Sequence, residues 1–265
     1  MNIVITGASD GIGKAMAVEF AKRGARLGLV ARRKEMLEAL ATELRAGGAA
    51  EVVIEVVDVT DHAAQRAAFE RFEAHFAGGI THLVLNAGVS GRGDPWTDSW
   101  ESAKHCFDVN LMAAVNAAEW MKPRMVKRGG GTIAGVSSIA AYRGLPDSGV
   151  YSSSKAALTA YLESLRVDLA RYGVHIVTIA PGYIQTALTK KNRGAMPFLM
   201  DAGAAGRIFA RAVLSGKRVS VAPWQYNFAI AAMKTMPVFV YDFLIGKFMK
   251  GVRGETPESR RASKT

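Results

Sequence analysis

The chain alternates short runs of β-branched and other apolar residues with longer segments in which apolar residues recur at helical spacing. Short apolar runs are typical of buried parallel strands, and the segments between them are typical of helices that cover a sheet on both faces. The pattern therefore predicts an α/β domain with a doubly wound parallel sheet. The expected strands lie at residues 3–5, 26–30, 52–57, 82–85, 131–136, 175–179 and 219–221.

The same pattern predicts how the chain is divided. Residues 1–223 contain all of the expected strands and form one domain, which is followed by an apolar and basic extension at residues 224–253. Pro237 separates two short helices that we expect in this extension, and residues 254–265 are expected to be a flexible tail. Charged residues interrupt every apolar stretch before it reaches the ~20 residues of a membrane-spanning helix.

A glycine-rich segment follows the first expected strand. It reads Thr6-Gly7-Ala8-Ser9-Asp10-Gly11-Ile12-Gly13, and a helix is expected from about Lys14. Glycines here let the backbone turn tightly and approach a pyrophosphate, whose charge is held by the free N–H groups of the helix. We expect this segment to bind a dinucleotide through Gly7, Ser9, Asp10, Gly11, Ile12 and Gly13. The alternative is a glycine turn that only lets the strand and the helix pack closely.

The second expected strand indicates which dinucleotide is bound. It ends at Ala31, where a sheet that selects NAD offers an acidic side chain to the ribose hydroxyls. Alanine removes the carboxylate that would repel a 2′-phosphate, and the guanidinium of Arg32 or Arg33 can bind that phosphate through paired hydrogen bonds. The sequence therefore predicts NADP(H). The alternative is that both arginines are solvated surface charges.

Two further polar segments follow expected strands. Asp58-Val59 comes after the third strand, and Asn86-Ala87-Gly88 comes after the fourth. Ligands of open α/β sheets bind at the carboxyl ends of the strands, so both segments are expected to border the dinucleotide. The alternatives are that Asp58 caps the next helix and that Asn86-Ala87-Gly88 is a plain turn.

Tyr151 and Lys155 are a candidate proton-transfer pair. They are four positions apart at the start of an expected helix, so their side chains project from one face. An ammonium beside a phenol favours the phenolate and lowers a pKa that is ordinarily ~10. The tyrosine can then donate or accept a proton near neutral pH. Helices without any such role also carry this spacing.

Residues 2–223 resemble the short-chain dehydrogenase/reductase family. The motifs that carry the resemblance occur in the family's order, and they are the glycine loop, Asn86-Ala87-Gly88, Asn110, Ser138, Tyr151-x-x-x-Lys155 and Pro181-Gly182. The resemblance implies a Rossmann-type sheet of seven parallel strands. It also implies an oxidoreductase that interconverts a ketone or aldehyde and its alcohol by hydride transfer with tyrosine proton transfer. A different class of function, a non-catalytic dinucleotide-sensing or interaction protein on this fold, is the alternative.

The resemblance implies catalytic roles for four residues. Tyr151 would give a proton to the carbonyl oxygen, and Lys155 would lower its pKa and hold the nicotinamide ribose. Ser138 would hydrogen-bond the same oxygen, with Ser137 as the competing serine. Asn110 would position a water bonded to Lys155.

Further cofactor contacts are implied in the same way. The segment that would close over the nicotinamide contributes Pro181, Gly182, Ile184 and Thr186. Asp10 departs from many NADP-preferring relatives, which carry a basic residue in the glycine loop. Selection of the 2′-phosphate would therefore rest on Ala31, Arg32 and Arg33, with Arg32 favoured.

The substrate pocket implied by the resemblance is apolar. Its segments are residues 91–96, 140–150 and 183–200, and they contain Trp96, Tyr142, Leu145, Met196, Phe198, Leu199 and Met200. This lining is expected to suit a hydrophobic carbonyl compound or alcohol, although the same residues could instead cover the core. No metal is expected, because the five histidines and one cysteine show no ligand spacing.

The charge is concentrated in the last third of the chain. The whole chain carries +11, but residues 187–265 hold 14 Lys and Arg against 4 Asp and Glu, and the remainder is nearly neutral. Basic and aromatic residues alternate in the extension, which is expected to meet an anionic membrane surface or a second subunit. We expect a homodimer, because the extension would obstruct the tetramer contact that many family members make, and we expect no nucleic-acid partner.

The sequence also favours a cytoplasmic location, with peripheral association at a membrane. Cys106 is the only cysteine, so no intrachain disulfide requires an oxidising compartment. The first residues reach Gly7 without the charged and then apolar segments of a signal peptide.

Overall fold

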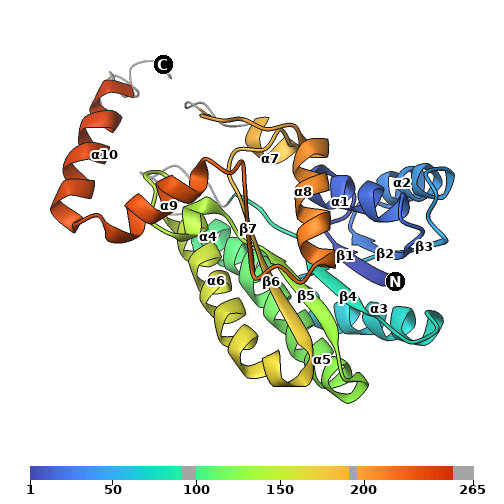
Figure 1. Cartoon of the computed structure of the whole chain (residues 1–265). Coiled ribbons are helices and arrows are strands. Elements are labelled where there is room, and N and C mark those ends of the chain that lie inside the picture. The colour runs from blue at the N-terminus through green and yellow to red at the C-terminus, as the bar shows by residue number, and fades with distance from the viewer. Residues whose placement is uncertain (91–99, 191–195, 253–265) are drawn as a thin grey trace.

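The computed structural model describes residues 1–90, 100–190 and 196–252, with side chains described up to residue 246. Its sheet contains seven parallel strands in the order β3-β2-β1-β4-β5-β6-β7 (Figure 1). Each expected strand is confirmed to within two residues at either end. The strands are β1 (Asn2–Thr6), β2 (Arg26–Ala31), β3 (Glu51–Val56), β4 (His82–Leu85), β5 (Gly131–Val136), β6 (Val174–Pro181) and β7 (Val219–Ala222).

Helices cover both faces of this sheet (Figure 1). One face carries α1 (Gly11–Ala21), α2 (Lys34–Ala46) and α8 (Ala202–Leu214), and the other carries α3 (His62–His75), α5 (Ala113–Arg128) and α6 (Gly149–Leu169). The helix α4 (Trp100–Phe107) continues into α5 through a π-helical turn, Asp108–Met112. The remaining helices are the short α7 (Ala187–Lys190), α9 (Tyr226–Thr235), α10 (Val238–Val252) and two 3₁₀ turns, Ile139–Ala141 and Ala170–Tyr172.

Successive side chains of the strands point into two different hydrophobic cores, one on each face of the sheet. Ile3 and Ile5 pack in one cluster with Phe20 of α1, whereas Val4 between them packs with Phe72 of α3 in the other. Strand side chains alternate between the two faces of a sheet, so a strand with helices on both sides must be apolar at every position. This accounts for the continuous apolar runs in the sequence.

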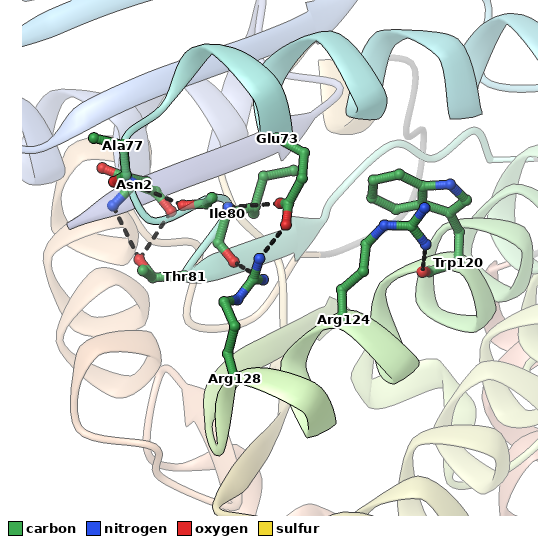
Figure 2. Close-up of polar contacts among 9 residues, drawn as sticks. Asn2, Glu73, Ala77, Ile80, Thr81, Trp120, Arg124 and Arg128 are labelled. Atoms are coloured by element: carbon green, nitrogen blue, oxygen red, sulfur yellow. Dashed lines mark hydrogen bonds and ion pairs between the residues drawn. The ribbon is translucent and has the colours of Figure 1, made fainter.

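Hydrogen bonds and an ion pair hold the amino-terminal edge of the sheet (Figure 2). The backbone N–H of Asn2 donates to Oγ1 of Thr81 at 2.9 Å. Arg128, at the end of α5, pairs with Glu73 of α3 and donates to the carbonyl of Ile80 at 2.8 Å. The turn before β4 is therefore held by contacts with β1, α3 and α5. The carboxyl ends of the strands lie at the opposite edge of the sheet.

The extension after β7 forms two helices that meet at Pro237, as the sequence predicts. Tyr226 and Ile230 of α9 are buried, but Phe228 of α9 and Phe239 of α10 are 71% and 76% exposed. Figure 1 shows α10 standing apart from the sheet and its covering helices. Across the described part of the chain, no helix is long and apolar enough to cross a membrane. The expected tail at 254–265 lies outside the described residues, and the boundary at residue 224 stays a prediction.

Candidate active site

The glycine loop lies in close contact with the end of β4. Gly7 and Gly11 have positive φ angles of 66° and 58°, a region that residues with a Cβ adopt only with strain. A Cβ on Gly13 would lie 2.4 Å from Nδ2 of Asn86 and 2.6 Å from the carbonyl oxygen of Gly7. Only glycine fits at this position. Glycine therefore lets the loop pack against the end of β4, at the edge of the sheet where a pyrophosphate would bind.

The helix α1 is capped by Asp10 and begins earlier than the sequence predicted. Its carboxylate accepts a hydrogen bond from the N–H of Gly11 at 2.7 Å, and α1 begins at Gly11. The prediction of a start near Lys14 is wrong, because capping by Asp10 outweighs the low helix propensity of Gly11 and Gly13. The buried Ser9 and the partly buried Ile12 flank this N-terminus. Its N–H groups and dipole make it a suitable place for a phosphate.

The two arginines after β2 have different partners. Nη1 of Arg32 lies 3.5 Å from Oδ2 of Asp58, whereas Nη2 of Arg33 donates to Oγ of Ser9 at 3.1 Å and lies 3.9 Å from Oδ2 of Asp10. Both guanidinium groups are largely exposed. They stand at the same corner as Ala31, which has no charge to repel a phosphate.

Asp58 stabilises its own turn and does not cap α3. Its Oδ1 accepts from the N–H and the hydroxyl of Thr60 at 3.0 and 2.8 Å. Burial raises the pKa of Asp58, but these bonds and the nearby Arg32 outweigh it, so the net pKa is lowered. The capping alternative is wrong, because Asp61 is the N-cap of α3 and accepts from Ala64. Val59 is buried in the core, so its backbone alone can face a ligand.

Asn86-Ala87-Gly88 does more than form a plain turn. Nδ2 of Asn86 donates to the carbonyls of Thr6 and Gly7 at 3.1 and 2.9 Å. In return, Oγ1 of Thr6 accepts from the N–H groups of Asn86 and Ala87 at 3.1 and 3.3 Å. Sequence reasoning missed Thr6, although its place between strand and glycines is visible in the sequence. These bonds fix the glycine loop to the end of β4.

Ser138, Tyr151 and Lys155 lie together beyond the end of β5. Ser138 is close enough to the phenol of Tyr151 to lower the pKa of that phenol, and Nζ of Lys155 lies 6.0 Å from the centroid of the Tyr151 ring. The competing Ser137 is directed into the protein, where its hydroxyl bonds the carbonyl of Lys155 at 3.0 Å and Oγ1 of Thr159 at 2.7 Å. The structure thus places Ser138 with the tyrosine, and Ser137 supports the helix beneath them.

The electrostatics of the pair differ from the sequence-based expectation. Burial raises the pKa of Tyr151, and the nearby Ser138 opposes this only in part. Burial also lowers the pKa of Lys155 to about 8, and its Nζ donates to the carbonyl of Val136 at 2.8 Å. The net pKa of Tyr151 is therefore raised in the protein alone, because burial dominates, and the influence of Lys155 on it stays a prediction.

Asn110 lies in the π-helical turn, which could not be predicted from the local sequence. Its Nδ2 donates to the carbonyl of Val89 at 3.0 Å and to Oγ of Ser154 at 3.0 Å, and its Oδ1 accepts from the N–H of Val89 at 2.8 Å. A Cβ on Gly88 would lie 3.2 Å from Oδ1 of Asn110 and 3.3 Å from Nζ of Lys155. Both polar groups therefore border the space beside Gly88. Ser154 was missed, although it directly precedes Lys155.

The segment after β6 lies over the glycine loop. The side chain of Thr186 would lie 3.1 Å from a Cβ on Gly11. Ile184 is buried and forms a β-bridge with Met200. Pro181 and Gly182 connect the end of β6 to this segment, and the N–H of Gly182 donates to the carbonyl of Ala222 at 2.8 Å. The residues expected to close over the nicotinamide are thus next to those expected to hold the phosphates.

The expected substrate lining is described only in part. Trp96 and the rest of 91–96 lie outside the described residues. Phe198 and Leu199 are 55% and 40% exposed, and the half-buried members are Tyr142, Leu145, Met196 and Met200. Among the side chains that the structure describes, no group of three or more His, Cys, Asp or Glu is placed to hold a metal ion.

We expect the burial of Lys155 to make stability depend on pH. Its pKa is about 8 in the folded protein, against an ordinary 10.5. The native state then binds fewer protons than the unfolded chain between these values, so the contribution of Lys155 should rise with pH through this window, by roughly 3 kcal/mol. Urea unfolding of the wild type and of Lys155→Met across this range measures it. The wild type should gain stability relative to the variant as pH rises, and a flat or falling difference would contradict the assignment.

Comparison with known proteins agrees with this geometry. The family model for the short chain dehydrogenase matches residues 1–197. The chain is 36% identical over 239 residues to an uncharacterized oxidoreductase of Myxococcus xanthus, which covers 90% of this chain and 94% of the relative. It is also 36% identical over 193 residues to an 11-beta-hydroxysteroid dehydrogenase-like 2 protein of Arabidopsis thaliana, covering 71% of this chain and 60% of the relative.

A solved structure extends the similarity over nearly the whole chain. A short-chain dehydrogenase from Sphingobium yanoikuyae, in complex with NADPH, superimposes with a TM-score of 0.79 at 25% identity, covering 98% of this chain and 99% of that one. The glycine loop, the α1 N-terminus and the strand ends described above fit a nicotinamide dinucleotide. The chain therefore belongs to the short-chain dehydrogenase family and is an oxidoreductase that binds a nicotinamide dinucleotide.

Proposed function

We propose that this oxidoreductase uses NADP(H) and interconverts a hydrophobic ketone or aldehyde and its alcohol. The proposal rests on one observation. Ser138, Tyr151 and Lys155 lie close together at the carboxyl edge of the sheet, the same edge as the glycine loop. The cofactor, when bound, supplies or accepts the hydride. The protein must then hold the carbonyl group, bind the charge that develops on its oxygen and deliver a proton to it.

Tyr151 and Ser138 are proposed to serve the carbonyl oxygen. The raised pKa of Tyr151 keeps its phenol protonated, so its O–H can be donated during reduction. Ser138 can donate a hydrogen bond to the same oxygen and stabilise the negative charge there. Lys155 is proposed to hold the ribose hydroxyls through Nζ. Asn110, fixed by Val89 and Ser154, is proposed to hold the water through which Lys155 exchanges protons with solvent.

Selection of NADP(H) is proposed to rest on Ala31, Arg32 and Arg33. The end of β2 carries Ala31 in place of an acidic residue, and both arginines follow it directly in the chain, with the carboxylates of Asp58 and Asp10 beside them. The bond from Arg33 to Ser9 brings one guanidinium group to the glycine loop. A 2′-phosphate placed between the arginines would receive charge-assisted hydrogen bonds. The similar Sphingobium yanoikuyae protein was solved with NADPH, which also supports this choice.

The hydrophobic substrate is proposed from the residues near the site. Phe198, Leu199 and Met200 lie in the segment bridged to Ile184, and Tyr142 follows the turn after Ser138. A pocket of such residues gains free energy by removing apolar surface of the substrate from water. The Arabidopsis thaliana relative is named for a hydroxysteroid, an apolar alcohol.

An anionic membrane surface is the partner that we propose for the extension. Trp224, Phe228, Val238, Phe239 and Phe243 are each at least 64% exposed, and the sequence of the extension contains four basic residues and one acidic residue. Exposed aromatic side chains enter the lipid interface, while lysine and arginine bind anionic headgroups. The homodimer stays a prediction, and the same surface could serve it.

Tyr151→Phe tests the proton transfer. Turnover with any accepted carbonyl compound should fall by roughly 100-fold or more, because general acid catalysis is lost, while the Kd for NADPH stays within about twofold. Tyr161→Phe, in the same helix, removes a hydroxyl that bonds Glu119 at 2.6 Å and serves as the matched control. Full activity in Tyr151→Phe would refute the assigned role.

Arg32→Ala and Arg33→Ala test the selection of the cofactor. Each should raise the Kd for NADPH by roughly 10-fold or more, as expected for the loss of a charge-assisted hydrogen bond, and leave that for NADH nearly unchanged. Lys34→Ala is the control, because Lys34 pairs with Glu38 of its own helix at 3.7 Å. Equal losses for both cofactors in a fluorescence titration would rule out a 2′-phosphate site.

Sedimentation with vesicles tests the membrane surface. The wild type should sediment with vesicles of phosphatidylcholine and phosphatidylserine, and less with phosphatidylcholine alone. The double variant Phe239→Ser/Phe243→Ser should stay in the supernatant, whereas Val167→Ser, which replaces a side chain 77% exposed on α6, should still sediment. A wild type that never sediments contradicts the proposal. If light scattering instead shows that the double variant turns a dimer into a monomer, the surface is a subunit interface.

A further inference from the structure

The helices after β7 contact the segment that follows β6. Tyr226, the first residue of α9, is buried, and its hydroxyl donates to the carbonyl of Pro197 at 2.5 Å. Its ring meets that of Phe198 edge-on, with centroids 5.8 Å apart. A Cβ on Gly182 would lie 2.2 Å from the Tyr226 ring, so the ring rests directly on the backbone of this glycine. The start of α9 is therefore fixed to the segment that carries Ile184.

The junction between α9 and α10 contacts a second segment, which follows Ser138. Nη1 of Arg143 donates to the carbonyls of Met233 and Met236, each at 3.2 Å. Its guanidinium carbon lies 4.4 Å from the centroid of the Tyr241 ring in α10, and the hydroxyl of Tyr241 donates to the carbonyl of Gly144. The loop thus donates hydrogen bonds to the junction through Arg143, and α10 donates one back to the loop through Tyr241.

These contacts meet the chemical needs of the junction. The last carbonyls of α9 have no partner within the helix, and a cation at the C-terminus is favoured by the helix dipole. Arg143 supplies the donor and the charge, and its flat guanidinium stacks on an aromatic ring. Nζ of Lys234 lies 4.8 Å from the centroid of the Tyr142 ring and adds a second cation–π contact. Pro237 prevents α9 from continuing past this point.

Both contacted segments border the proposed catalytic residues. The loop with Arg143 joins Ser138 to Tyr151, and its Leu145 N–H donates to Oγ of Ser152, next to Tyr151, at 3.3 Å. The other segment is described at residues 182–190 and 196–200, and these two parts are joined by the β-bridge between Ile184 and Met200. The same pair of helices therefore connects the two segments that are expected to line the substrate site.

We propose that α9 and α10 form a bracket that holds these two segments at a fixed separation, with Arg143 and Tyr226 as positioning residues that determine which carbonyl compounds are accepted. The statement about substrates rests on the proposed function. The bracket itself does not, because it predicts a mechanical connection that exists in the protein without substrate.

Three variants of the junction test the bracket. Arg143→Ala removes the hydrogen bonds and the stacking, Arg143→Lys keeps a donor without the flat guanidinium, and Tyr241→Phe keeps the ring but loses the bond to Gly144. Arg171→Ala is the matched control, because Arg171 also stacks on a tyrosine, Tyr172, at 4.8 Å, after the far end of α6. If Arg143→Ala does not fold, the other two variants provide the same test.

Hydrogen exchange of the protein without ligand is the first measurement. In Arg143→Ala, amides at 142–148 and at 226–236 should exchange roughly 10-fold faster together, because local opening becomes easier. Arg143→Lys and Tyr241→Phe should show smaller increases, and Arg171→Ala none in these segments. Unchanged exchange in Arg143→Ala, or a change confined to one segment, would refute the bracket whether or not the protein reduces any carbonyl compound.

Kinetics with a series of ketones of increasing chain length is the second measurement. The ratio of KM between the longest and the shortest accepted ketone should change by roughly fivefold or more in Arg143→Ala, while the Kd for NADPH and kcat for the shortest stay within about twofold. A changed exchange rate with an unchanged KM ratio would overturn the role in specificity. If no carbonyl compound is turned over by the wild type, the proposed function fails and hydrogen exchange still decides the bracket.

Discussion

Asn86 joins two strand ends at the centre of the sheet, and the geometry of the site follows from this contact. Its amide nitrogen donates to the carbonyls of Thr6 and Gly7, while Gly13 lies so close that a Cβ would be 2.4 Å from that nitrogen. The glycine loop is thereby held against β4, and the N-terminus of α1 opens on the same edge. A larger residue at Gly13 would separate the loop from β4 and move the phosphate-binding N–H groups.

The proposed chemistry depends on burial beside that edge. Lys155 and Tyr151 are both desolvated. Burial lowers the pKa of Lys155 and raises that of Tyr151, so the neutral form of each side chain is favoured. A protonated phenol suits a proton donor, and a lysine with a pKa of about 8 can bind or release a proton near neutral pH. The bracket of α9 and α10 is the corresponding constraint on the substrate side. It connects the loop before Tyr151 to the segment after β6. The same two helices therefore hold both the catalytic groups and the groups proposed to bind the substrate.

The strands could be predicted from the sequence, as could the grouping of most candidate site residues at one edge of the sheet, because a parallel sheet needs continuous apolar runs and the ligand edge needs glycine and polar residues in a fixed order. Other features depend on tertiary contacts. The start of α1 follows from the Asp10 cap, and the pKa of Tyr151 from burial that periodicity does not reveal. The π-helical turn at Asn110 and the bonds of Arg143 to α9, 90 or more residues further along the chain, leave no local signal.

We propose that this site reduces a hydrophobic carbonyl compound with NADPH. The most direct measurement is the rate of NADPH oxidation, followed at 340 nm, over a panel of aldehydes, ketones, steroids and 3-oxoacyl compounds, with NADH in parallel. We expect oxidation that depends on at least one apolar carbonyl compound, with a higher kcat/KM for NADPH than for NADH. Tight binding of NADPH without oxidation by any member of the panel would contradict it.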